Sequence, residues 1–182
     1  MISAFLFVMA AWGLYVLLRP VNRELALLFL SLNAIGVAIQ AASYVPLIFA
    51  TLATDASGFA AAFSQPQTES LQRLSLEVQE LSFITAQLFF AAWLFPLGYL
   101  VYMSGFLPKF LGVLLILDGF AVALWFLQGM LLPDNPALST PGLALSFIAE
   151  VGLGLWLLLK GIGDEQDAPG PAVERRASAT AP

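Results

Sequence analysis

Apolar residues recur along this chain in long uncharged runs, separated by short segments rich in charge, proline and glycine. A helix that crosses the hydrocarbon core of a bilayer needs about 20 predominantly apolar residues. Five runs come close to this length or exceed it. The pattern predicts an all-α fold, a polytopic transmembrane helix bundle with spans at about residues 2–18, 25–50, 81–103, 110–132 and 141–160.

The first run is the shortest, and a cleaved signal peptide is its competing interpretation. It has no basic residues ahead of its apolar core, and it continues into Arg19 without a small-residue cleavage site. We therefore expect residues 2–18 to be retained as a span. The second run contains Pro46 near its far end, where we expect a kink or the end of the helix.

The sizeable loop between the second and third spans, residues 55–80, has helical periodicity in its second half. Polar and charged residues separate four apolar ones that share a helix face: Leu71, Leu74, Val78 and Leu81. Thr68, after Pro66, is the expected N-cap. We predict an amphipathic helical segment on the outer face before span three. It either lies on the membrane interface or forms the first part of one long rod.

Lysine and arginine predict the orientation of the bundle. Of the 7 such residues, all but Arg73 fall in the first connection, in the third connection or after the last span. Connections rich in these residues stay in the cytoplasm, so the N-terminus is expected outside and the C-terminus in the cytoplasm. Residues 1–162 then form the bundle. Residues 163–182 have no apolar periodicity and are expected to be a disordered cytoplasmic tail.

The amino-acid composition limits the kinds of metal and catalytic site that the chain can form. Hydrophobic residues make up 60% of the 182 residues and charged residues 10%, against about 45–50% and about 25% in soluble domains. The chain has no cysteine and no histidine, which excludes thiolate metal sites, histidine-ligated metals and Ser-His catalysis. We expect no cofactor and no metal. The net charge of −5 gives no support to nucleic-acid binding.

Two acidic residues lie inside predicted spans, Asp118 in the fourth and Glu150 in the fifth. A carboxylate in hydrocarbon costs about 2.5–3.5 kcal/mol on insertion scales, so such acids normally face the bundle or a wet cavity. By helical rise, Asp118 lies about 12 Å from the Phe110 end and Glu150 about 13 Å from the Leu159 end, so they can share a depth. The pair could relay protons or hold a cation or basic ligand. Alternatively, each acid hydrogen-bonds a neighbouring helix and fixes packing.

Further polar residues lie at helical spacing within the spans and mark candidate inward faces: Asn33, Gln40, Gln87 and Ser146. They are compatible with a polar interior and equally with a bundle held together by interhelical hydrogen bonds. The sequence contains no phosphate-binding loop and no nucleophile-elbow motif. Nothing in these patterns indicates an enzyme.

Four segments in combination are distinctive: LYVLLRPVNR at 14–23, WLFPLGYLVY at 93–102, SGFLPKFLGVL at 104–114 and EVGLGLWLLLKG at 150–161. The chain resembles the family of bacterial membrane proteins catalogued as domain of unknown function 4386. The resemblance implies a multi-helix protein of the bacterial inner membrane with no assigned activity. It also implies that Glu150 matches an acid that recurs in the last helix, whereas Asp118 matches no family pattern. Family members usually begin with a further hydrophobic segment, so the resemblance implies either a misplaced start or a shorter member.

Three hypotheses of function follow, of which an intramembrane enzyme acting on a lipid is the least favoured, because the chain has no histidine, no cysteine and no recognisable nucleophile. The favoured one is a non-enzymatic membrane protein, structural or regulatory, whose partners are the lipid bilayer and other membrane proteins, a second copy of this chain included. The alternative is a small proton- or ion-coupled transporter that uses Glu150 and Asp118. Convergence of both carboxyl groups on one wet cavity would favour transport, and an acid facing lipid would count against it.

Overall fold

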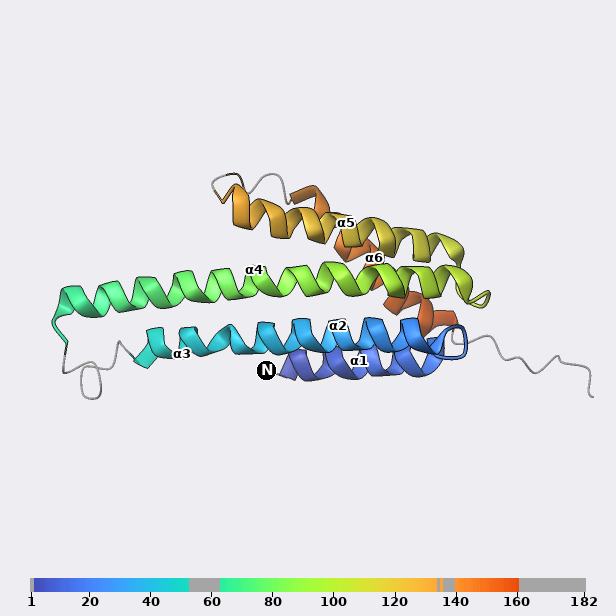
Figure 1. Cartoon of the computed structure of the whole chain (residues 1–182), viewed down its shortest axis with the longest axis horizontal. Coiled ribbons are helices and arrows are strands. Elements are labelled where there is room, and N and C mark those ends of the chain that lie inside the picture. Colours follow the sequence, from blue (N-terminus) through green and yellow to red (C-terminus); the bar gives the residue numbers. More distant parts are fainter. Residues whose placement is uncertain (1, 53–62, 134, 136–139, 161–182) are drawn as a thin grey trace, which may run out of the picture.

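The computed structural model describes residues 2–52, 63–133, 135 and 140–160. All regular elements in these ranges are helices (Figure 1): α1 (Ile2–Leu18), α2 (Arg23–Ala42), α3 (Tyr44–Leu52), α4 (Gln65–Met103), α5 (Lys109–Leu131) and α6 (Thr140–Lys160). The prediction of an all-α bundle is confirmed. The predicted tail, residues 163–182, lies outside the described residues.

Among the described residues, four helical stretches are long and apolar enough to cross a membrane, as expected for a membrane protein: 23–52, 65–103, 109–131 and 142–159. The apolar helix α1 has 17 residues, at the lower limit for a span. Its crossing of the membrane stays a prediction.

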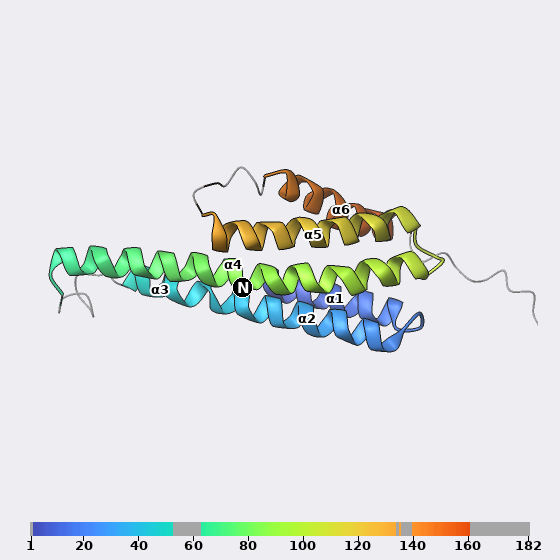
Figure 2. The same ribbon diagram turned by 45° about the horizontal axis from the view of Figure 1, so that its top comes forward.

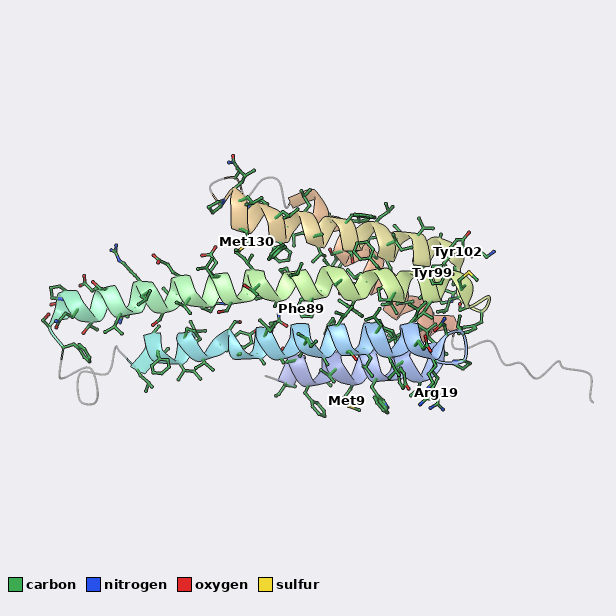
Figure 3. The ribbon with its side chains drawn as sticks, viewed as in Figure 1. Met9, Arg19, Phe89, Tyr99, Tyr102 and Met130 are labelled. Carbon is green, nitrogen blue, oxygen red and sulfur yellow. The ribbon has the colours of Figure 1, made fainter. Side chains whose placement is uncertain are left out.

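Helix α4 is the centre of the bundle. It lies between α2 and α5 in both views, while α1 packs on α2 and α6 packs on α5 (Figures 1 and 2). Phe89 points from α4 toward α2 (Figure 3), close to Gly36, where an added Cβ would lie 3.2 Å from the Phe89 Cβ. The two outer helices, α1 and α6, thus lie on different partners on either side of α4.

The long rod is the correct alternative for the segment before span three. Helix α4 runs without interruption for 39 residues, about 58 Å. Its N-terminal part and α3 extend beyond the ends of α1 and α5 (Figure 1). The predicted N-cap at Thr68 is wrong, since the helix begins after Ser64, whose backbone N–H donates to Gln67 Oε1 at 2.9 Å. Pro66 is accommodated in the first turn, where its missing N–H costs no hydrogen bond.

The predicted interruption near Pro46 is confirmed and lies at Ser43, between α2 and α3. Proline has no N–H to donate to the carbonyl four residues earlier, so the helical bonding stops there. Ser43 compensates locally. Its hydroxyl donates to Gln40 O at 2.7 Å, while its backbone N–H makes the last bond of the α2 helical series, to Ile39 O at 2.9 Å.

Helices α4 and α5 form the tightest contact of the fold. Gly105 has a φ of 75°, a conformation that glycine adopts readily, and it reverses the chain between the two helices. A Cβ added to Gly112 would lie 2.6 Å from Gly98 O, so the two backbones touch at this point. Large side chains around this contact are fully or almost fully buried: Leu94, Leu97, Leu100, Val101, Leu111 and Leu115.

Candidate functional site

Asp118 is buried at the interface between α5 and α6, with 0% of its surface exposed. The hydroxyl of Ser146, on α6, donates a hydrogen bond to Asp118 Oδ1. The other carboxyl oxygen, Oδ2, has no hydrogen-bond partner among the described residues. This bond links the two helices directly.

A cavity of about 340 Å³ lies among α1, α2, α4, α5 and α6. We call it the polar cavity because an acid, two amides and two hydroxyls line it: Glu150, Gln40, Gln87, Ser3 and Ser146. All of these except Ser3 are among the six residues that the sequence marked as candidates, and those four come from three helices. The structure therefore brings the predicted polar faces of α2, α4 and α6 to one place.

Aromatic rings form much of the rest of this cavity: Phe7, Phe83, Phe90 and Trp125. The ring of Phe7 meets Phe90 edge to face, with centroids 5.8 Å apart, and it meets Trp93 in the same way at 5.7 Å. Phe83 and Trp125 form a similar pair at 6.0 Å. Each of these rings is thus held in place by another ring.

A second cavity, of about 790 Å³, lies between α1 and the C-terminal half of α6. We call it the apolar cavity. Trp93 and Leu97 from α4 and Leu115 from α5 line it between the two outer helices. Gly13 and Gly154 also line it, and a Cβ added to either glycine would meet nothing within 4 Å. Glycine leaves open space here.

Phe7 and Glu150 line both cavities, so the two are parts of one feature, which we call the α1–α6 groove. Glu150 is exposed in the isolated chain, whereas Asp118 is buried and lines neither cavity. The Ser146 side chain connects them, because it lines the polar cavity and bonds to Asp118. Among the residues lining the groove in the described part of the chain, Glu150 is the charged one and none is basic.

Asn33 is placed differently from the other candidates. It is buried with 0% exposure, as an inward residue should be, but it lines neither cavity. Its side-chain Nδ2 and Oδ1 have no hydrogen-bond partner within the described ranges. The sequence placed it on the correct face of α2 without placing it in the groove.

Sequence reasoning did not place any aromatic ring or glycine in a groove. Phenylalanine, tryptophan and glycine are all common in membrane helices, so none stands out without knowledge of its neighbours. The polar residues gave a signal because they are costly in hydrocarbon.

The comparisons with known proteins give one family and one distant relative. A sequence model of the family described as "Domain of unknown function (DUF4386)" matches residues 1–161. A protein of Archaeoglobus fulgidus described only as uncharacterised is 29% identical over 159 residues, which are 85% of this chain and 76% of the relative. No solved structure matches the chain. Because the family model covers most of its length and its helices are those of a membrane bundle, this chain belongs to the DUF4386 family.

Proposed function

We propose that this chain is a non-enzymatic protein of the cell membrane, structural or regulatory in role, that acts by binding a small amphiphilic molecule in the α1–α6 groove. The observation that carries the proposal is the meeting of a polar and an apolar cavity at Glu150. Small-molecule sites are mostly apolar cavities of about 300–1,000 Å³ with a few polar groups that fix orientation. An amphiphile has one part that suits each cavity.

The chemistry of the lining favours binding over catalysis. Two hydroxyls line the groove, those of Ser3 and Ser146, and the Ser146 hydroxyl donates its proton to Asp118. In serine hydrolases an imidazole accepts the proton of the serine, and the chain contains no histidine. The other polar groups of the polar cavity are two amides and one carboxyl, which bind and orient readily.

A proton- or ion-coupled transporter is the second candidate, because Glu150 lies where the cavities meet and Ser146 connects it to a second acid. It is less favoured because Asp118 lines neither cavity, so the two carboxyl groups do not converge on one space. Flux of protons or alkali cations in reconstituted vesicles separates the candidates. Flux above that of empty vesicles, lost in Glu150→Gln, would favour transport over simple binding.

The groove itself can be tested by tryptophan fluorescence. Trp93 lines the apolar cavity and Trp125 the polar one, so a Trp12→Phe, Trp156→Phe background reports on the groove. In an uncharged detergent, bromodecanol should quench this emission saturably. Gly154→Leu fills open space in the groove and should abolish the saturable part, whereas Ala144→Leu, on an exposed position of the same helix, should not. Linear quenching that Gly154→Leu leaves unchanged would contradict the proposal.

For the orientation we propose that the N-terminus lies outside and the C-terminus in the cytoplasm. Arg19, Tyr99 and Tyr102 lie at the same end of the bundle (Figure 3). Lys109 is there too, with its Nζ 5.6 Å from the centre of the Tyr102 ring. A basic end is typical of the cytoplasmic boundary, and tyrosines are typical of either boundary between membrane and water. The polar cavity, lined by the N-terminal halves of α1 and α6, then lies toward the outer side.

A further inference from the structure

We propose that the ligand of the α1–α6 groove is a lipophilic cation, with an ammonium group in the polar cavity and an alkyl chain in the apolar cavity. The inference rests on the proposed function and specifies the chemical class of its ligand. A free long-chain amine and a lipid with an ammonium headgroup share this chemistry.

Charge is the first argument. Glu150 is the charged residue that lines both cavities, and no lysine or arginine lines either of them in the described part of the chain. Asp118 places a second carboxyl behind Ser146, which lines the polar cavity. A carboxylate in a bilayer is stabilised by an opposite charge. A cation in the groove supplies that charge, and an anion would add repulsion.

The aromatic lining is the second argument. Ammonium and quaternary ammonium groups bind against the faces of aromatic rings, tryptophan best of all. Trp125 and three phenylalanines surround the polar cavity, and ring-to-ring contacts hold them there. Gln87 is 5% exposed, with its Nε2 3.5 Å from Phe83 O, so the donor side of the amide faces its own helix. An anionic headgroup would form few favourable interactions with these lining side chains.

Shape is the third argument. From Glu150 to Leu158 the groove follows α6 for about 12 Å at the helical rise. Along this length the lining residues other than Glu150 are apolar. A single alkyl chain of medium length, with its cationic group at the Glu150 end, matches this order of polar and apolar walls.

Competition with bromodecanol tests the inference. Decyltrimethylammonium, decanol and decyl sulfate share one alkyl chain and differ in charge. We expect the cation to displace the bromoalcohol at a concentration about tenfold lower than decanol does, and decyl sulfate to be weaker than both. Glu150→Gln should remove the advantage of the cation and leave decanol unchanged. Glu24→Gln, at an exposed acid at the start of α2, is the matched control and should keep the advantage.

Two further variants guard against a folding defect in Glu150→Gln. Glu150→Asp keeps the charge and should keep the preference for the cation. Trp125→Leu removes a ring face without changing charge, and it should weaken binding of the cation more than binding of decanol. Loss of the preference for the cation in Glu150→Gln, together with a smaller preference in Trp125→Leu, would support the inference.

The outcomes distinguish this inference from the proposed function. If the cation and decanol displace bromodecanol equally well, and Glu150→Gln changes neither, the inference of a cationic ligand would be overturned. The groove would remain a site for amphiphiles. Quenching that is neither saturable nor sensitive to Gly154→Leu would overturn both. Displacement by short-chain phosphatidylcholine but not by its phosphatidylglycerol counterpart would assign the site to a lipid headgroup. Displacement by decyltrimethylammonium but by neither lipid would assign it to a free lipophilic cation.

Discussion

At the scale of single residues, the bond between Ser146 and Asp118 is a side-chain hydrogen bond that joins α5 to α6. The cost of a carboxylate in hydrocarbon predicted an inward position for Asp118, and helical spacing predicted one for Ser146. The sequence could not say that they meet, because the facing partner depends on the register between two helices. Hydrogen bonds of this kind between membrane helices contribute about 0.6 kcal/mol on average and about 1.7 kcal/mol at most.

We predict that Ser146 and Asp118 are energetically coupled. In a double-mutant cycle of Ser146→Ala and Asp118→Ala, the coupling should be about 1 kcal/mol, because each single substitution already breaks the bond. Unfolding in mixed micelles with increasing dodecyl sulfate measures the free energies. Ser82 is the matched control, since its hydroxyl bonds to Val78 O of its own helix. Ser82→Ala should be additive with Asp118→Ala, and additivity of the Ser146 pair would refute the coupling.

At the scale of helices, hydropathy located the spans well and the ends of helices less well. Long apolar runs define spans because a helix in hydrocarbon must satisfy its backbone hydrogen bonds within the segment. The start of α4 at Ser64 rather than Thr68 depends on a local cap, the bond from Ser64 N–H to Gln67, which the apolar pattern does not record.

We predict that the contact between α4 and α5 tolerates no side chain at Gly112. Gly112→Ala would place a methyl 2.6 Å from both Gly98 O and Tyr102 N, and these backbone atoms cannot move aside. The helices must separate, which should lower the free energy of unfolding by about 1–3 kcal/mol. Thermal unfolding in detergent measures the change.

Gly13→Ala is the matched control for this contact. It is also a helical glycine, but an added Cβ meets nothing within 4 Å. Alanine is the better helix former, so Gly13→Ala should leave the stability equal or slightly higher. A loss in Gly13→Ala as large as that in Gly112→Ala would show that the contact between α4 and α5 is not the cause.

At the scale of the whole molecule, the number of crossings and the orientation can be tested together. The chain has no cysteine, so each introduced cysteine is the sole thiol. An impermeant maleimide should label Ile2→Cys and Glu69→Cys on intact cells. It should label Pro20→Cys and Phe106→Cys only after the membrane is permeabilised, because these turns lie at the basic end. Labelling of Ile2→Cys only after permeabilisation would show that α1 does not cross.

By itself, the sequence determined the class of the fold, the approximate positions of its helices and the inward positions of Asn33 and Asp118. These properties follow from costs that each helix meets alone in hydrocarbon: unsatisfied backbone groups and buried polar side chains. Only the tertiary structure decided that α1 and α6 leave a groove between them and that Glu150 lies where its two cavities meet. It also decided that Asp118 accepts a hydrogen bond from Ser146. Lipid supplies little hydrophobic force between helices, so their arrangement depends on how particular surfaces, distant in sequence, fit together.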